Sequence, residues 1–148
     1  MKRVAVLDPG RCKCGLVLAD LQLDLVREGH VLAPEAVEPW LEQWNQDEAL
    51  DRILIGDGTG SRAWIKRLER LGNLTVVPEQ GTTLRARQRY WTLWPARGWR
   101  RMLPAGLRIP PVDLDAVAAL VMLEEHLQCR LRWPEPAPTF SLRTWPEP

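Results

Sequence analysis

Short apolar segments that alternate with helical patterns are the feature that most restricts the fold of this chain. Residues 3–8, 52–55 and 74–78 have the composition of β-strands, and the segments 35–50 and 61–71 place apolar residues at helical spacing. Strands that are joined through a helix pair in parallel by a right-handed crossover. We therefore expect these three strands to point the same way and to end at one edge of the sheet, where α/β proteins build their sites.

Two more strands are expected before the first helix. Residues 15–20 and 23–33 follow the first strand through short connections, which predicts an antiparallel meander. Two further helices are expected after the last strand, over residues 82–94 and 114–128. The sequence thus predicts an α/β fold with a five-stranded mixed sheet, three strands antiparallel and then two parallel, and with helices on both faces.

Two of the helix starts carry side chains suited to capping. Ser, Thr and Asp accept hydrogen bonds from the free amides of a helix N-terminus. We expect Ser61 or Thr59 to cap the helix of residues 61–71 and Asp113 to cap the last helix.

The length of 148 residues is that of one domain with its own hydrophobic core. We expect this domain to span residues 1–128. Within it, residues 95–111 are expected to be irregular because Pro95 stops the preceding helix. Residues 129–148 are a proline-rich C-terminal tail that we expect to be extended or disordered.

Composition and charge exclude several classes of protein. No apolar run approaches the length of a membrane span, and the N-terminal segment lacks the features of a signal peptide, so we expect a cytoplasmic protein without membrane partners. The cysteines, Cys12, Cys14 and Cys129, have neither the even number of a disulfide framework nor the spacing of a zinc site. The net charge of +1 does not by itself indicate a nucleic-acid partner.

Three acidic residues are placed to meet at the expected sheet edge. Asp8 ends the first strand, Glu79 follows the strand of residues 74–78, and Asp115 lies in the first turn of the last helix, on the flank that faces the sheet. Clustered carboxylates repel one another, and a bound divalent cation offsets the repulsion. Oxygen ligands suit Mg²⁺ or Mn²⁺, and two such ions can activate water and stabilise the leaving oxygen in phosphodiester hydrolysis. We therefore predict that Asp8, Glu79 and Asp115 are metal ligands and catalytic residues.

Each acid also has a purely structural interpretation. Asp8 precedes a Pro-Gly pair and could start a turn. Glu79 could be a surface residue at a strand end, and Asp115 could favour the positive N-terminus of its helix. Asp57, between two glycines, could be a turn residue or could line the rim of the site.

An arginine-rich segment indicates where a nucleic acid could bind. No acidic residue interrupts the run of arginines from Arg85 to Arg108, and four aromatic residues lie among them, Tyr90, Trp91, Trp94 and Trp99. Arginines neutralise phosphates and aromatic rings stack on bases. The alternative is a helix whose tryptophans pack in the core and whose arginines are solvated, and the sequence leaves both open.

The candidate nucleic-acid contacts come from three places. They are the basic residues of the loop after the first strand, the amides at the N-terminus of the helix of residues 61–71, and two arginines one turn apart on the helix of residues 82–94. The predicted contacts are Arg11, Lys13, Gly58, Thr59, Ser61, Arg85 and Arg89.

Four segments, taken in chain order, each resemble one motif of a known family. They are VLDPGRCKCGLVLAD, with its second-strand glycine at Gly15, ILIGDGTG, VVPEQGTTLRARQRY, with Glu79 before a Thr-Thr pair, and VDLDAVAALVMLEEHL, with Asp115 as the matching acid. Together these segments, over residues 3–128, resemble the YqgF and RuvC group of the ribonuclease H-like superfamily.

The resemblance implies a ribonuclease H-like fold and a Mg²⁺-dependent nuclease. Its substrate would be pre-ribosomal RNA in the YqgF branch or Holliday junctions in the RuvC branch, whose resolvases act as dimers, which makes a homodimer possible here. The sequence departs from the pattern at Gln80, where YqgF proteins carry arginine, and at Gly56-Asp57-Gly58, which replaces a glycine-proline strand end. RNA and branched DNA therefore both remain open as substrates.

Three other functions fit parts of the sequence. A non-catalytic nucleic-acid-binding module on the same fold would bind its partner without cleaving it. A sugar-kinase or actin-like phosphotransferase also has an early Asp-x-Gly loop, but it normally has two such domains in a longer chain. An α/β interaction protein would use the tryptophan-rich segment as a partner surface.

Overall fold

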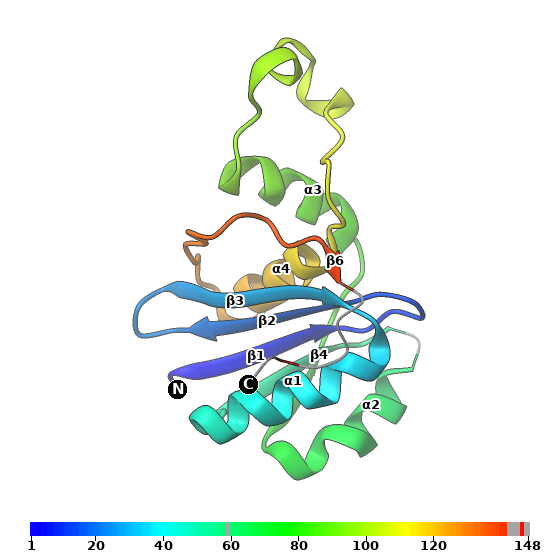
Figure 1. Cartoon of the computed structure of the whole chain (residues 1–148), viewed down its shortest axis with the longest axis vertical. Coiled ribbons are helices and arrows are strands. Elements are labelled where there is room, and N and C mark those ends of the chain that lie inside the picture. The colour runs from blue at the N-terminus through cyan, green and yellow to red at the C-terminus, as the bar shows by residue number, and fades with distance from the viewer. Residues whose placement is uncertain (59, 142–145, 147–148) are drawn as a thin grey trace.

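A computed structural model describes residues 1–58, 60–141 and 146 of the chain. Within these residues one mixed sheet has six strands in the order β5-β4-β1-β2-β3-β6 (Figure 1). β2 pairs antiparallel with both β1 and β3, whereas β4 is parallel to β1 and β5, and β6 is parallel to β3. The strands are β1 Arg3–Asp8, β2 Cys14–Asp20, β3 Leu25–Leu32, β4 Arg52–Gly56, β5 Leu74–Val77 and β6 Phe140–Ser141.

The α/β class and the mixed sheet are confirmed, but the predicted count of five strands is wrong. The sixth strand comes from the proline-rich tail and pairs with the edge of β3. Leu131 and Trp133, which precede it, are buried in the core, and the amide of Val26 donates to the carbonyl of Arg132 at 2.8 Å. Two buried side chains and backbone hydrogen bonds fix this part of the tail. Hydrophobic periodicity in the sequence predicts neither kind of contact.

Four helices of the described chain cover the two faces of the sheet (Figure 1). They are α1 Pro34–Asp47, α2 Ser61–Leu68, α3 Thr82–Leu93 and α4 Asp115–Leu127. Side chains of β1 alternate between the faces: Val4 and Val6 pack in a core cluster with α3 and α4, and Ala5 and Leu7 pack in a second cluster with α1 and α2. None of these helices combines the length and the apolar character that crossing a bilayer requires.

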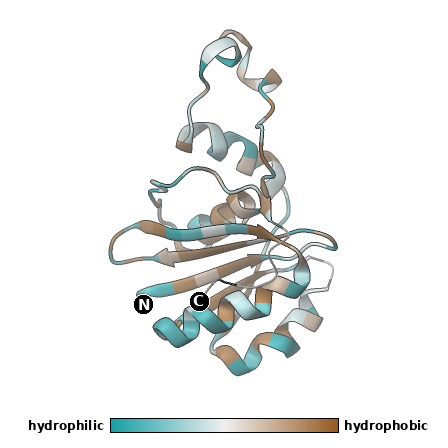
Figure 2. Ribbon diagram, in the orientation of Figure 1, coloured by the Kyte–Doolittle hydropathy of each residue, from teal (hydrophilic) through white to brown (hydrophobic). Residues whose placement is uncertain are grey.

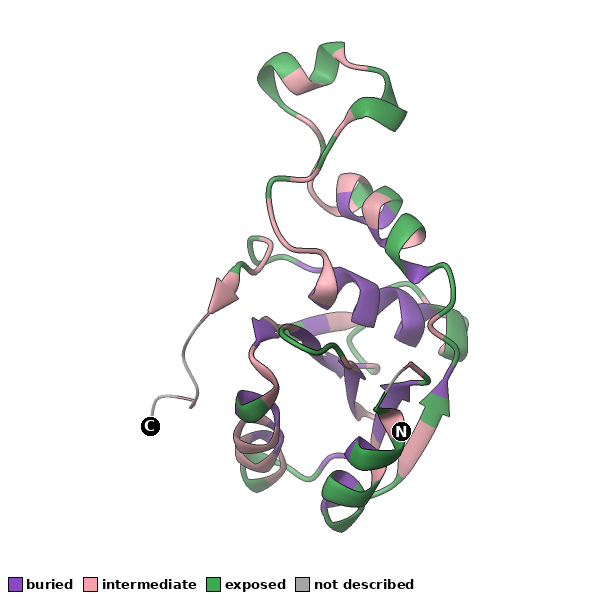
Figure 3. Cartoon of the chain, turned by 90° about the vertical axis from the view of Figure 1, so that its right-hand side faces the viewer, coloured by how far each residue is buried: buried purple, intermediate pink, exposed green. Residues whose placement is uncertain are grey.

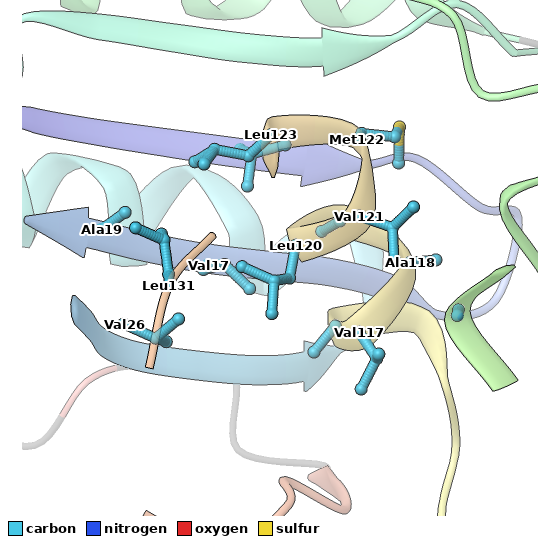
Figure 4. Close-up of a cluster of buried hydrophobic side chains, with 14 of the residues drawn as sticks. Val17, Ala19, Val26, Val117, Ala118, Leu120, Val121, Met122, Leu123 and Leu131 are labelled. Atoms are coloured by element: carbon cyan, nitrogen blue, oxygen red, sulfur yellow. The ribbon is translucent and has the colours of Figure 1, made fainter. Parts of the chain in front are cut away.

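α4 is the most buried helix of the domain. Every residue from 116 to 124 is buried, because the sheet lies against one side of the helix and α3 packs on it as well. Leu120 and Leu123 of α4 lie over Val17 of β2 and its neighbours (Figure 4). Apolar residues accordingly concentrate on the strands and on α4, whereas the outer surface of α1 is hydrophilic (Figure 2).

Two of the predicted helix caps, Ser61 and Asp113, are wrong. α2 begins after Gly60, which has a φ of 90° in the left-handed region, and Ser61 is the first helical residue without a side-chain cap. Thr59, the other predicted cap, lies outside the described residues. Leu114, not Asp113, is the residue that precedes the first turn of α4, and the Asp113 carboxylate accepts a hydrogen bond from Lys13 instead.

Residues 95–111, which we call the arm, project from the domain between α3 and α4 (Figure 1). The arm contains two 3₁₀ helices, Gly98–Met102 and Ala105–Leu107, and none of the residues in them is buried. The outer part of the arm is exposed on nearly all sides, in contrast to the buried strands and α4 (Figure 3).

Candidate functional site

The carboxyl ends of the three parallel strands bring Asp8 and Glu79 together. β1 ends at Asp8, and β4 beside it ends at Gly56. β5 ends at Val77, two residues before Glu79, so all three ends form one edge of the sheet. The side chains of Asp8 and Glu79 are close enough to share a hydrogen bond when Asp8 carries the proton.

Two glycines, one at the end of β4 and one in the loop after it, make room for the Glu79 carboxylate. A Cβ on Gly56 would lie 2.5 Å from Oε2 of Glu79, and a Cβ on Gly58 would lie 1.8 Å from Oε1. A larger residue at Gly58 would therefore displace the carboxylate. The small residues of this loop thus leave the space that the Glu79 side chain occupies. The spacing of these glycines did not suggest this role, because it depends on how the side chain of Glu79 folds back over β4.

Asp57 and Thr82 hold the backbone of Glu79 from two sides. The amide of Glu79 donates to Oδ1 of Asp57 at 3.1 Å, and Oγ1 of Thr82 donates to the carbonyl of Glu79 at 2.7 Å. Of the two interpretations open for Asp57, the structure favours a place at the rim of the site. The sequence signals were an acid inside the glycine-rich loop and a threonine three residues after Glu79.

Asp115 reaches the same edge because α4 begins directly against β2. Gly15 of β2 pairs with Asp8 of β1. A Cβ on Gly15 would lie 1.9 Å from the carbonyl oxygen of Asp115 and 2.7 Å from the amide nitrogen of Ala116. The glycine therefore lets the first turn of α4 contact the strand next to Asp8, which places the third acid at the cavity that Asp8 lines.

A small cavity of about 180 Å³ opens between these elements. It is lined by Asp8, Thr83, Leu114, Asp115 and Ala118. Burial raises the pKa of Asp8 to about 7, and the negative charges of Glu79 and Asp115 and the hydrogen bond with Glu79 raise it as well. A carboxyl with such a pKa is half protonated near neutral pH, unlike an ordinary aspartate.

The other two acids are also difficult to ionise. The pKa of Glu79 is raised by burial and by the charge of Asp57, and an amide hydrogen bond from Gly58 opposes this rise in part. The pKa of Asp115 is raised by burial and by the charge of Asp113. The negative charges of Glu79 and Asp115 disfavour the ionised form of Asp8, and a bound cation would relieve that repulsion.

The cluster fits a hard divalent cation. Oε2 of Glu79 is buried and has no hydrogen-bond partner among the described residues, which is costly for a carboxylate oxygen. The donors are carboxylate oxygens, the ligands that Mg²⁺ prefers. In the described part of the chain, no group of three or more His, Cys, Asp or Glu residues is arranged as a complete metal site. Asp8 and Glu79 are thus the pair in direct contact, and Asp115 lines the cavity with Asp8.

The loop after β1 presents one basic side chain to solvent. Nζ of Lys13 lies 3.0 Å from Oδ1 of Asp113 and 5.0 Å from the centre of the Phe140 ring, so it joins the loop to the start of α4 and to β6. Arg11 is exposed, and its side chain makes no hydrogen bond or ion pair with any described residue. Of the two residues predicted to contact a substrate here, Arg11 is the one with an available charge.

The two arginines of α3 do not form a joint phosphate site. Arg89 is 9% exposed, and its guanidinium donates to both carboxylate oxygens of Glu124 at 2.8 and 2.9 Å and to the carbonyl of Leu131 at 2.8 Å. The prediction that Arg89 contacts phosphate is therefore wrong, because its charge is neutralised inside the core. Arg85 pairs with Glu125 at the surface.

The amides at the start of α2 are also occupied. The amide of Ser61 donates to the carbonyl of Gly58 at 3.1 Å, and the amide of Gly58 faces Glu79. The predicted contribution of Thr59 lies outside the described residues. These hydrogen bonds leave the amides of Gly58 and Ser61 unavailable for the predicted phosphate contact.

The fold and the site define an α/β protein with a partly buried cluster of acids at the carboxyl ends of its parallel strands. Comparison of the sequence with protein-family models finds no matching family, and comparison with curated proteins finds no significant match. What the protein does is therefore inferred from the chemistry of its own residues.

Proposed function

We propose that this protein is a Mg²⁺-dependent nuclease of the ribonuclease H-like type that hydrolyses phosphodiester bonds in structured nucleic acid, either pre-ribosomal RNA or branched DNA. The observation that carries the proposal is that Asp8 interacts with Glu79 at one edge of the sheet and shares a small cavity with Asp115, with a raised pKa for each of the three acids. Partial burial of Asp8 next to two other carboxylates costs free energy in a purely structural role, and a divalent cation would offset that cost.

The sheet topology supports the same proposal. Without β6 the order is β5-β4-β1-β2-β3, with three antiparallel strands next to two parallel ones, which is the sheet that the resemblance to the ribonuclease H-like superfamily implies. Gly15, the glycine of the first resembling segment, is where α4 contacts β2. That contact links the first and last resembling segments at the site.

The roles of the side chains follow from their positions. Divalent cations, when bound, supply Lewis acidity that activates water and stabilises the leaving oxygen. Asp8, which interacts with both other acids, would be the shared ligand, and Glu79 and Asp115 would complete the coordination. Asp57 orients Glu79 through its backbone amide, and the exposed Arg11 would contact the phosphate backbone of the substrate.

A cleavage assay with Mg²⁺ or Mn²⁺ tests the proposal. The substrates should be a four-way DNA junction, a single-stranded RNA and a precursor ribosomal RNA. Asp8→Asn keeps the shape of the side chain but removes its charge, so we expect it to abolish metal-dependent cleavage while the circular dichroism spectrum stays unchanged. The matched control Asp47→Asn removes a charge from the exposed end of α1 and should cleave as the wild type does. Undiminished cleavage by Asp8→Asn would reject the assignment.

A second candidate is a nucleic-acid-binding module without catalysis. It is favoured by Gln80, which stands where the resembling YqgF segment carries arginine. Retained affinity for a structured nucleic acid, with no cleavage in either metal, would select this function over the nuclease.

A further inference from the structure

The arm carries exposed apolar side chains within a positively charged segment. The sequence has no acidic residue from Gln80 to Val112. Trp99 is 65% exposed and Met102 is 88% exposed, on the part of the molecule that stands farthest from the sheet (Figures 1 and 3). Exposed apolar residues among positive charges indicate a binding surface for a partner that is both anionic and able to stack.

Hydrogen bonds inside the arm fix its shape. Nε of Arg108 donates to the carbonyl of Arg100 at 3.0 Å, and Nη2 of Arg87 on α3 donates to the carbonyl of Gly106 at 2.8 Å. Nε1 of Trp91 donates to the carbonyl of Arg108 at 3.2 Å. The arm is therefore a preorganised element, and Arg87 and Arg108 use their donors to hold it together.

Three other arginines keep their charge available to a partner. The side chains of Arg97 and Arg101 are exposed and make no hydrogen bond or ion pair within the described part of the chain. The guanidinium of Arg100 lies over the ring of Trp99, with 5.0 Å from its Cζ to the ring centre. A guanidinium beside an exposed indole offers charge and a stacking surface at one place.

A groove of about 430 Å³ lies at the base of the arm. Its lining includes Trp91, Trp94, Arg97, Arg100, Pro111 and Pro134. The walls are thus flat apolar rings and proline rings with two cationic groups at the side. Unpaired bases fit such rings, and phosphates fit the cations, whereas a duplex keeps its bases stacked on one another and presents mainly phosphates.

We propose that the arm and the groove at its base bind a single-stranded segment of nucleic acid. Trp99 and the groove tryptophans stack on bases, and Arg97, Arg100 and Arg101 contact phosphates. The inference rests on the proposed function for the identity of the substrate, since the arm would hold an unpaired part of the nucleic acid that the carboxylate site cleaves. The C-terminal end of the arm leads to α4, which begins at Asp115, and its N-terminal end follows α3, which begins three residues after Glu79.

Fluorescence anisotropy with labelled oligouridine and oligothymidine, in EDTA to prevent cleavage, measures this binding. Trp99→Ala should weaken the affinity by about 5- to 100-fold, the range for one base-aromatic stack, and leave its salt dependence unchanged. Arg97→Gln combined with Arg100→Gln should weaken the affinity and lower the slope of log affinity against log salt by about 0.7 for each phosphate that the variant no longer neutralises. The control pair Lys66→Gln and Arg130→Gln removes two exposed charges outside the arm and should change neither quantity.

Several outcomes would overturn the inference. One is equal affinity of Trp99→Ala and the wild type for both oligonucleotides; another is tighter binding of a blunt-ended duplex than of either single strand. A third is a change in sedimentation of Trp99→Ala without a change in oligonucleotide affinity, which would make the tip of the arm a contact between copies of the chain. If the variants change oligonucleotide binding as expected but no metal supports cleavage, the binding role of the arm stands and the nuclease proposal fails. If the protein cleaves nucleic acid but the arm variants bind oligonucleotides as the wild type does, the nuclease proposal stands and the binding role of the arm fails.

Discussion

Asp8→Asn should make the metal-free protein more stable near neutral pH, although it removes the central acid of the site. The pKa of Asp8 is about 7 in the folded protein, against 3.8 for an unperturbed aspartate. Because the folded protein binds this proton more tightly than the unfolded chain, its contribution to stability is complete below the unfolded pKa of 3.8. That contribution is lost as the pH rises through about 7.

The size of the effect follows from the two pKa values. One pKa unit corresponds to about 1.4 kcal/mol, so the rise from 3.8 to about 7 corresponds to about 4 kcal/mol of stability lost on ionisation. Asp8 is only partly buried, and water that reaches it screens the neighbouring acids, so we expect about 2 kcal/mol in solution. For a chain of this length, that is a rise in Tm of about 4–8 °C for Asp8→Asn.

Thermal unfolding in EDTA at about pH 4 and about pH 8 measures this difference. The wild type should lose stability between the two values, and Asp8→Asn should lose much less. Adding Mg²⁺ at the higher pH should raise the Tm of the wild type, because a ligand of the folded state stabilises it, but not that of Asp8→Asn. Asp47→Asn, the surface control, should follow the wild type. The reasoning is refuted if Asp8→Asn is no more stable than the wild type in EDTA at the higher pH.

Three further changes test other parts of the structure. Gly58→Ala should push the Glu79 carboxylate out of place and reduce metal-dependent cleavage by about 10- to 100-fold, as changes around metal ligands do, with little change in circular dichroism. Glu124→Ala leaves the buried guanidinium of Arg89 unpaired and should lower the free energy of unfolding by about 3–5 kcal/mol in urea, whereas a small loss would show that the pair is solvated. Trp133→Ala should cost about 3–5 kcal/mol in the same assay, and an unchanged urea midpoint would show that the tail is not part of the core.

The meeting of Asp8 with Glu79 could be predicted because strand direction decides it. A right-handed connection through a helix makes successive strands parallel, so residues at their carboxyl ends share an edge whatever their separation in sequence. The position of Asp115 could be predicted because the apolar residues of its helix define the face that packs on the sheet, and Asp115 lies on the flank of that face. These inferences need only periodicity and chain direction, both of which are local properties of the sequence.

The partners of the charged side chains could not be predicted in the same way. Arg89 reaches Glu124 across 35 positions and Lys13 reaches Asp113 across 100 positions, and each pairing depends on how two elements pack. The arginines of the arginine-rich segment look alike in the sequence, but in the structure one is buried in an ion pair and others are exposed. Arg89 is buried in an ion pair, whereas Arg97 is exposed on the arm.

Tertiary contacts also decided the tail and the helix ends. β6 is two residues long and has no alternation that a sequence pattern could detect, so its pairing depends on the backbone of β3 and on buried residues before it. Gly60 precedes α2 in a left-handed conformation that glycine adopts without steric cost, and the helix has no side-chain cap there.

One carboxylate connects the tail, the core and the groove of the arm. Glu124 of α4 accepts hydrogen bonds from Arg89 of α3 and from the amide of Leu131, so it fixes the start of the tail against α3. Trp133 then packs edge-on against Trp94 with 5.2 Å between ring centres, and the prolines that follow form one wall of the groove whose other wall is the end of α3. The groove therefore depends on the tail as much as on the arm. A buried ion pair that looks purely structural thereby helps to set the geometry of the groove that we propose as a surface for single-stranded nucleic acid.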